Sequence, residues 1–371
     1  MDKAYLDPFL HRKTLRWCEP YNGGMSLKDT GLCNRLLHWE VAYEINKLND
    51  FKFKILLEDC HWKELKYLKL PNTLPVRDTY FSNKKVLDLK FKSVYDYDNQ
   101  TVYLAEPLLT KDMKKMVKSK NFTLDKDNYY ADFGYDFIEE VKGPGKRGLE
   151  LIQFKHKDFE KIIKNQVKGC IGLHIRRGEG ITVTLDHINQ LPKEIQHFFD
   201  SQKGDPKYKW ISDPQYFNVI DGILKKHPQV RFYLSTDMLE DQYSYLIQRY
   251  KGRFVTRKEV YNKVFHLANY FESVDDWQLG AFVNIIDLFA LGSCEFIIKA
   301  PGSTWSDVAA IWRKTPSIDI DQDSKVIIKK VNNYFDWGKF GFKNVPFNYI
   351  VEEIKDKRIN NLYSKNDLDP N

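Results

Sequence analysis

The sequence has few cysteines, no long apolar run and no block of one charge. No run of about 18 apolar residues occurs, and the stretch before Lys13 lacks the apolar core of a signal peptide. The chain is therefore expected to have no membrane span and to be cytoplasmic. The cysteines are odd in number and widely spaced, which favours reduced, buried thiols over a disulfide framework or a zinc site. They are Cys18, Cys33, Cys60, Cys170 and Cys294.

The charges are numerous but mixed. The 58 basic and 51 acidic residues give a net charge of +7 and are interspersed along the chain. This balance suits a phosphate-bearing ligand or an anionic surface, although an ordinary solvated basic surface explains it equally well. Without a basic block or an RNA-binding or zinc-finger motif, a nucleic-acid partner is not expected. The oligomeric state is not indicated.

The length of 371 residues suits two domains, each able to bury its own core. We expect a first domain over residues 1–166, a second over 167–330 and a C-terminal extension over 331–371, with a helix at Phe347–Lys357. In the first domain, a strand at Thr14–Cys18, a helix at Cys33–Leu48 and a strand at Phe53–Leu57 form a βαβ unit. Irregular structure is expected over Asn72–Gly148, followed by a helix over Leu149–Gln166.

The second half alternates short apolar runs with helical periodicity, which is typical of a doubly wound parallel sheet in an α/β fold. Strands are expected at Cys170–Ile175, Val230–Leu234, Arg253–Thr256, Phe296–Lys299 and Val326–Ile328. Helices are expected at Pro214–Lys226, Leu239–Tyr250, Asp276–Leu291 and Ser303–Arg313.

Polar residues follow these strands, and in open α/β sheets ligands bind beyond the carboxyl ends of the strands. The strand Cys170–Ile175 contains His174 and leads into Arg176 and Arg177. Two guanidinium groups suit a pyrophosphate, but an ordinary salt-bridged pair is the alternative. The strand Val230–Leu234 leads into Ser235-Thr236-Asp237, which supplies a hydroxyl and a carboxylate to the same edge.

Two further features have a functional and a structural interpretation each. The segment Ser303-Thr304-Trp305 begins a helix whose N–H groups and hydroxyls can hold a phosphate, unless Ser303 is only an N-cap. Asp287 lies on an apolar helix stripe and needs a partner, which is either the donor edge of a guanine or a neighbouring cation.

These residues carry a resemblance. The order H-x-R-R-G-[D/E], S-T-D, D-x-x-x-L and S-T-[FW]-S-x-x-A-A resembles the donor-binding half of the fucosyltransferase superfamily, which includes α1,2-, α1,6- and NodZ-type enzymes and protein O-fucosyltransferases. The segment Gly31-Leu32-Cys33-Asn34-Arg35-Leu36 is similar to the element that opens the first domain in those families. The resemblance implies a GT-B fold, with two Rossmann-like domains facing across a cleft, and an inverting transfer of L-fucose from GDP-fucose to a glycan.

The resemblance also implies roles for single residues. His174 and Asp287 would contact the guanosine, Arg176 would hold the β-phosphate and Arg177 would support it. Ser303, Thr304 and Trp305 would complete the phosphate pocket, with Ser235 and Asp237 lining it. Gly31 and Asn34 would face the donor from the first domain. Glu179 stands where the family usually has Asp.

The mechanism expected from these residues needs neither a cofactor nor a metal, because arginine and a helix N-terminus can neutralise the departing GDP. The strings Asp96-Tyr97-Asp98, Asp125-Lys126-Asp127 and Asp319-Ile320-Asp321 are interpreted as accidental. Glu179 and Asp186 are the candidate bases, each with a surface salt bridge as the alternative. The aromatic segment Gly180–Trp210 is the candidate acceptor site.

Two alternatives remain open. The donor can instead be GDP-rhamnose, GDP-mannose or a UDP-sugar. The chain can also be a non-catalytic protein that binds carbohydrate or nucleic acid. A P-loop phosphotransferase is disfavoured because Gly143-Pro144-Gly145-Lys146-Arg147 lacks the required motif.

Overall fold

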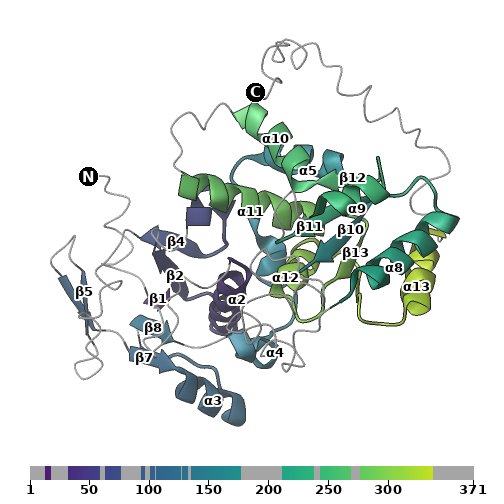
Figure 1. Ribbon diagram of the computed structural model, residues 1–371. Coiled ribbons are helices and arrows are strands. Elements are labelled where there is room, and N and C mark those ends of the chain that lie inside the picture. Colours follow the sequence, from purple (N-terminus) through teal and green to yellow (C-terminus); the bar gives the residue numbers. More distant parts are fainter. Residues whose placement is uncertain are drawn as a thin grey trace, which may run out of the picture.

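The computed structural model of the chain contains two five-stranded sheets, and every strand pair within them is parallel (Figure 1). The structure describes residues 13–17, 32–58, 63–76, 93–96, 101–104, 106–126, 128–132, 135–176, 211–237, 243–268 and 276–336. The two parallel sheets confirm the expected α/β class. No helix within these ranges has the length and apolar character needed to cross a membrane.

The first sheet has the order β4-β2-β1-β8-β7. Its strands are β1 (Lys13–Trp17), β2 (Phe53–Glu58), β4 (Thr73–Val76), β7 (Glu106–Leu109) and β8 (Asn128–Asp132). Helix α2 (Leu32–Leu48) joins β1 to β2, as the sequence predicts, and α3 (Thr110–Ser119) joins β7 to β8. Because each helix connects parallel neighbours, both run back from the carboxyl edge of the sheet to its amino edge.

The second sheet has the order β12-β11-β10-β13-β14. Its strands are β10 (Cys170–Ile175), β11 (Arg231–Thr236), β12 (Phe254–Thr256), β13 (Phe296–Lys299) and β14 (Ser317–Asp319). The chain moves outward from β10 to β12 and then returns to the other side of β10. The strand order therefore reverses between β10 and β13, and the carboxyl end of this point is where open α/β sheets bind ligands.

Helices cover both faces of the second sheet. Ile171, Leu173 and Ile175 of β10 face a cluster lined by α8 (Asp213–Lys226), α9 (Ser244–Arg249) and α13 (Ser324–Asp336). The opposite face packs on α10 (Arg257–Ala268), α11 (Asp276–Gly292) and α12 (Thr304–Arg313). A Cβ atom at Gly172 would lie 2.7 Å from the Leu291 side chain, so this glycine lets α11 lie close against β10.

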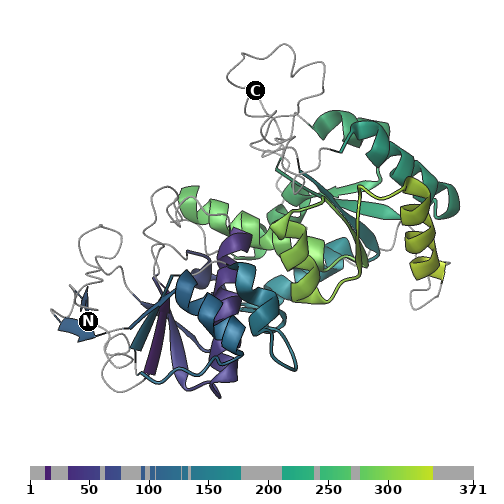
Figure 2. The same ribbon diagram turned by 90° about the horizontal axis from the view of Figure 1, so that it is seen from below.

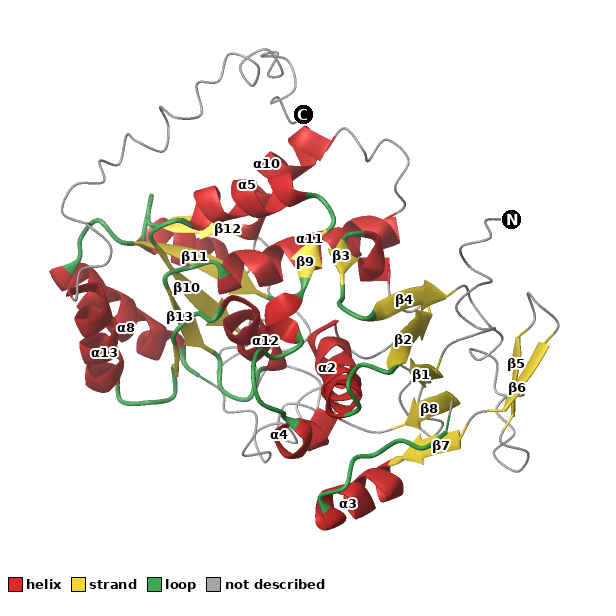
Figure 3. Ribbon diagram, turned by 180° about the vertical axis from the view of Figure 1, so that it is seen from behind, coloured by secondary structure: helices red, strands yellow, loops and turns green. Residues whose placement is uncertain are grey.

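One continuous core joins the two sheets. It includes buried residues of α2 together with α10, α11 and α12, and the last two of these helices lie between the sheets (Figure 2). The short antiparallel pair β3 (Leu68–Lys69) and β9 (Gln153–Phe154) also lies at this junction (Figure 3). There the Trp312 indole donates to the Ile152 carbonyl over 2.9 Å, and its ring stacks on Phe154. Apolar packing thus holds the two sheets together.

Several expected elements are wrong. The helix expected over Leu149–Gln166 is a 3-10 turn η6 (Leu149–Leu151), then β9, then α5 (Lys157–Val167). The strand expected at Val326–Ile328 belongs to α13, because Ile327, Val331 and Phe335 recur every four residues and are buried together.

The segment Asn72–Gly148 is more regular than expected. Besides strands of the first sheet and α3, it contains the antiparallel pair β5 (Ser93–Asp96) and β6 (Thr101–Leu104). It also contains the short helices η5 (Tyr135–Phe137) and α4 (Ile138–Val141). The sequence does not predict α10, and the described part of the helix expected at Leu239–Tyr250 is α9. The helix expected at Phe347–Lys357 lies outside the described residues.

Candidate functional site

Polar residues collect at the carboxyl edge of the second sheet, around the reversal of strand order. His174 is the fifth residue of β10, and Arg176 follows the strand directly. On the other side of the reversal, β13 leads through a turn into Ser303 and α12. The fold therefore brings together His174, Arg176 and Ser303, which the sequence predicts at one edge.

His174 is buried, and among the described residues its Nδ1 atom has no hydrogen-bond partner. Burial and, to a smaller extent, the positive charge of Arg176 lower the pKa of the imidazole to about 3. The ring is therefore neutral at physiological pH. A neutral imidazole can donate or accept one hydrogen bond at Nδ1, so this buried atom is suited to a ligand.

Ser303 occupies the N-cap position of α12 without acting as a cap. Its side chain makes no capping hydrogen bond, is 1% exposed and has a hydroxyl with no partner in the described structure. The simple N-cap interpretation is therefore wrong. The Ser303 hydroxyl and the first N–H groups of α12 form an arrangement that is suited to an anion.

Asp287 is held by hydroxyl groups. Tyr233 donates to one carboxylate oxygen over 2.5 Å, and Ser235 donates to the other over 2.8 Å. Burial raises the pKa of Asp287, whereas the charge of Arg257 and the two hydroxyl groups lower it. Each oxygen can accept a second hydrogen bond. Asp287 is thus a buried acid whose contacts within the described chain are neutral donors rather than a salt bridge.

The same network reaches α12. The Trp305 indole donates to the Ser235 hydroxyl over 3.1 Å, and Ser235 lies beside His174 in the register of β10 and β11. Asp287, Ser235 and Trp305 therefore connect α11, β11 and the first turn of α12. Their hydrogen bonds fix the helix start against the sheet edge.

The start of α2 reaches this edge from the other half of the chain. Burial raises the pKa of the Cys33 thiol, and the charges of Asp287 and Asp307 raise it further, whereas Arg176 lowers it. Cys33 therefore lies close enough to these charged residues for them to shift the pKa of its thiol. The next residue, Asn34, has a buried Oδ1 atom without a partner among the described residues.

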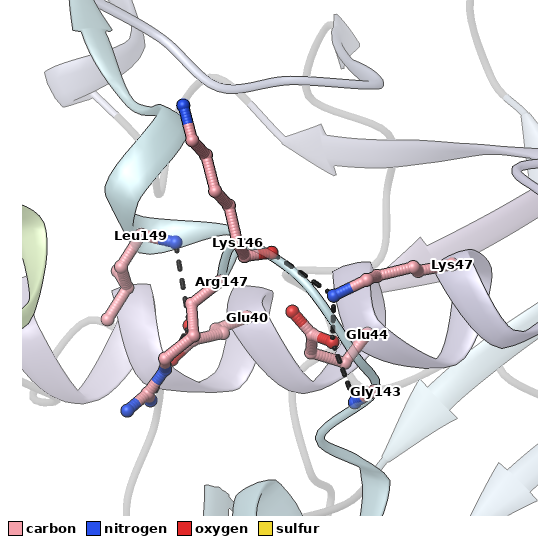
Figure 4. Close-up of polar contacts among 7 residues, drawn as sticks. All are labelled: Glu40, Glu44, Lys47, Gly143, Lys146, Arg147 and Leu149. Atoms are coloured by element: carbon pink, nitrogen blue, oxygen red, sulfur yellow. Dashed lines mark hydrogen bonds and ion pairs between the residues drawn. The ribbon is translucent and has the colours of Figure 1, made fainter.

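A second buried polar cluster braces α2 further along its length (Figure 4). Arg147 donates two hydrogen bonds to the Glu40 carboxylate, over 2.9 and 2.6 Å. Glu44 accepts from Lys47 over 3.0 Å and from the Gly143 backbone over 3.1 Å. Burial raises the pKa of Glu40, and Arg147 opposes this. This cluster ties α2 to the segment that the sequence excludes as a P-loop.

The remaining expected residues are divided between described and masked segments. Thr304 and Trp305 are half-buried in the first turn of α12, and Asp237 is exposed after β11. Outside the described residues lie Arg177, Glu179, Asp186, Gly31 and the segment Gly180–Trp210.

In the parts of the chain that the structure describes, no group of three or more His, Cys, Asp or Glu residues is arranged to hold a metal ion. Of the three Asp-x-Asp strings, only Asp319-Ile320-Asp321 is wholly described. Asp319 forms an ion pair with Lys299 over 3.4 Å, and Lys299 also contacts Asp307 over 2.7 Å. The carboxylate of Asp319 thus has a structural partner.

Sequence reasoning missed Tyr233 and Arg257, both of which act on Asp287. Tyr233 could have been found, because it shares strand parity with Ser235 and must face the same helix. Arg257 begins α10, a helix that the sequence does not indicate, and therefore gave no signal.

Comparison with known proteins gives structural likenesses alone. No protein-family model and no curated protein matches the sequence. Fucosyltransferase NodZ from Bradyrhizobium is 10% identical, with a TM-score of 0.42, over 81% of this chain and 91% of that one. POFUT1 in complex with GDP-fucose is 11% identical, with a TM-score of 0.44, over 85% of this chain and 99% of that one. With TM-scores below 0.5 these likenesses are too loose to support a function. A function must therefore be inferred from the chemistry of the chain's own residues.

Proposed function

We propose that the chain is a glycosyltransferase of the GT-B kind, in which the two sheets belong to two domains and the donor binds between them. The donor is GDP-fucose, and L-fucose moves with inversion to a glycan hydroxyl. The proposal depends on the residues at the carboxyl edge of the second sheet, together with the family resemblance of their motifs. It requires no metal ion.

Thirteen buried side-chain atoms of the described residues have no hydrogen-bond partner, and the proposal rests on three of them that lie on elements near the carboxyl edge of the second sheet. They are His174 Nδ1, Ser303 Oγ and Asn34 Oδ1. His174 of β10 and Ser303 at the start of α12 flank the reversal of strand order, and Asn34 lies in the first turn of α2, which packs against α12. A buried polar atom without a partner costs free energy. A ligand rich in hydrogen-bonding groups would satisfy all three.

A nucleoside diphosphate sugar fits this group chemically. The Ser303 hydroxyl and the N–H groups of α12 can donate to a phosphate, and the exposed guanidinium of Arg176 can neutralise it. The neutral imidazole of His174 and the remaining lone pairs of Asp287 can bind the base, whose N1–H and N2 groups are donors if it is guanine. Asn34 Oδ1 can accept from a sugar hydroxyl.

Transfer then breaks the bond between the anomeric carbon and the β-phosphate oxygen. The electron pair stays on that oxygen, where Arg176 and the start of α12 stabilise the new charge. The acceptor hydroxyl attacks from the opposite face of the sugar and loses its proton. Glu179 and Asp186 are the proposed acceptors of this proton.

Release of GDP from GDP-fucose, with and without a glycan acceptor, tests the proposed reaction. We expect release by the wild-type chain in the presence of a chelator, and release about 1,000-fold slower by Arg176→Ala, with an unchanged melting temperature. No hydrolysis and no transfer with any acceptor, together with GDP binding, would favour a non-catalytic binding protein. Loss of activity with the chelator would contradict the metal-free mechanism.

The identity of the donor is tested separately by thermal unfolding with GDP, GMP and UDP. A ligand that binds only the folded state at about 100 times its Kd adds about 2.7 kcal/mol of stability. We expect this effect from GDP and not from UDP. Stabilisation by UDP alone would instead favour a UDP-sugar and would remove the guanine role of Asp287.

A further inference from the structure

A basic and apolar surface lies at the opposite edge of the first sheet from the proposed donor site. It consists of the outer face of α3 and the turn Leu48–Phe51 that follows α2, and we call it the α3 surface. Both helices begin at the carboxyl edge of the first sheet and end at its amino edge. In Figures 1 and 3, α3 lies at the end of the molecule away from the second sheet.

Lysines dominate the outer face of α3. The stretch Thr110–Lys126 contains six lysines and two aspartates. Lys111, Lys114 and Lys118 are exposed, recur at helical spacing and lack an ion-pair partner among the described residues. Asp112 pairs with Lys115, and Asp125 pairs with Lys126. The apolar residues of α3 pack inward, with Met113 fully buried, so this helix offers charge rather than an apolar face.

The adjacent turn offers apolar side chains. Leu48 is 41% exposed and Phe51 is 42% exposed. Asp50 and Phe51 both have left-handed backbone angles, with φ of 55° and 54°, a conformation that residues other than glycine rarely adopt. These residues end α2, with the Phe51 N–H donating to the Asn46 carbonyl over 2.9 Å. One side of the Phe51 ring packs on Tyr43, with ring centroids 5.4 Å apart, and the rest of the side chain is exposed to solvent.

Hydrogen bonds of Asn49 fix the turn beside the end of α3. Its buried side chain donates to the Phe122 carbonyl over 2.9 Å and accepts from the Leu124 N–H over 2.9 Å. Phe122 follows α3 by three residues. The exposed Phe51 therefore lies on the same side as Lys118 at the end of α3, and Lys114 and Lys111 continue this surface along the helix.

We propose that the α3 surface docks the protein onto an anionic lipid bilayer. Lysine ammonium groups attract anionic headgroups, and a projecting phenylalanine can enter the region beneath them. Flexible lysines without arginine favour a diffuse layer of charge over a single bidentate ligand. Because α3 lies at the end of the molecule away from the second sheet, the proposed donor site stays open to solvent. This docking is independent of the proposed sugar transfer.

Cosedimentation with vesicles tests the docking. We expect the wild-type chain to bind vesicles of phosphatidylcholine with about one third phosphatidylserine, and not phosphatidylcholine alone. The variant Lys111→Gln, Lys114→Gln, Lys118→Gln should bind about 100-fold more weakly. The control Lys251→Gln, Lys329→Gln, Lys330→Gln changes the net charge equally at exposed positions of the other half, and it should bind like the wild type.

The variant Phe51→Asn separates the apolar contact from the charges. Asparagine tolerates a positive φ, so this variant should remain folded. We expect this variant to bind vesicles about 10-fold more weakly than the wild type. The ratio of the two affinities should not change with the salt concentration. The effect of the α3 lysines should shrink as the salt concentration rises to about 0.5 M. Lack of vesicle binding, equal losses in the control, or binding to single-stranded DNA but not to vesicles would overturn the proposal.

Discussion

Two buried polar clusters on facing elements differ in how their hydrogen bonds are satisfied. In the cluster on α2, Glu40 is paired with Arg147 within the chain, and the backbone at Gly143 donates to the neighbouring Glu44. In the cluster around Asp287, the carboxylate has two hydroxyl donors, but His174 and Ser303 at the same sheet edge have buried atoms without partners in the described structure. The Glu40–Arg147 pair is complete within the chain, although Glu44 Oε1 beside it has no partner in the described structure, whereas the atoms around His174 and Ser303 would be satisfied by the proposed ligand.

The largest expected effect is on activity at the sheet edge that carries His174 and Ser303. Arg176→Ala removes the charge that we propose stabilises the departing GDP, so transfer should fall by about 1,000-fold, with little change in stability because Arg176 is exposed. Rates of GDP release from GDP-fucose measure this. The matched control is Arg249→Ala, another exposed arginine, which pairs with Asp221. Equal rates in Arg176→Ala and the control would contradict the proposed role.

The Glu40–Arg147 pair should respond in the opposite way. Arg147→Ala leaves Glu40 buried without its cation and should lower the free energy of unfolding by about 3–5 kcal/mol. Activity per folded molecule should persist. Urea unfolding measures the loss, with Lys164→Ala as the control, because its pair with Glu160 is at the surface. A loss below about 1 kcal/mol would show that the brace is not needed.

Tyr233→Phe probes the hydroxyl that holds Asp287. The fully buried carboxylate would lose a donor that water cannot replace, so the free energy of unfolding should fall by about 2 kcal/mol. In the control Tyr129→Phe, the partner Asp125 is exposed, so water can take over and the loss should be smaller. Chemical denaturation of both variants compares them. An equal decrease in the free energy of unfolding in both variants would mean that burial of Asp287 does not raise the cost of losing its hydroxyl donor.

The pH dependence of stability should report His174. Its folded-state pKa is about 3, against an ordinary value of 6.5, so below about pH 6.5 the unfolded chain gains a proton that the folded chain does not. The stabilisation is complete above that pH and is lost as the pH falls towards 3. His174→Asn should therefore flatten the decline between about pH 6 and pH 4.5 by about 1.4 kcal/mol per pH unit.

Urea titrations across this range, beside Lys251→Gln as an unrelated surface variant, check the difference. The buried His38, with a pKa of about 4, should contribute in the same direction. An unchanged slope in His174→Asn would show that the imidazole is protonated in the folded state.

Much of the candidate site could be predicted from the sequence. His174 and Ser235 lie at the ends of short apolar strands, Ser303 follows the turn after another, and parallel strands bring such ends to one edge. Asp287 was also identifiable, because a carboxylate within an apolar helix needs a partner. These features can be predicted because strand period, strand parity and the starts of helices depend on residues that are neighbours in the sequence.

The parts that the sequence does not predict depend on distant contacts. The run Val326–Ile328 favours a strand by its β-branched residues, but packing of Ile327 against the core makes it helical. Burial of Trp312 against Ile152 and the pairing of Glu40 with Arg147 link residues more than 100 positions apart. Such contacts leave no periodic pattern in the sequence.

Calorimetric titration of GDP into the wild-type chain and into Ser303→Ala tests the central claim most directly. The Ser303 hydroxyl is buried without a partner in the described structure, so its loss should leave the unliganded fold unchanged. We predict that GDP binds the wild type, that UDP binds at least about 10-fold more weakly, and that Ser303→Ala weakens GDP by about 1–3 kcal/mol. Equal binding of GDP by Ser303→Ala and the wild type, or no binding by either, would contradict the account.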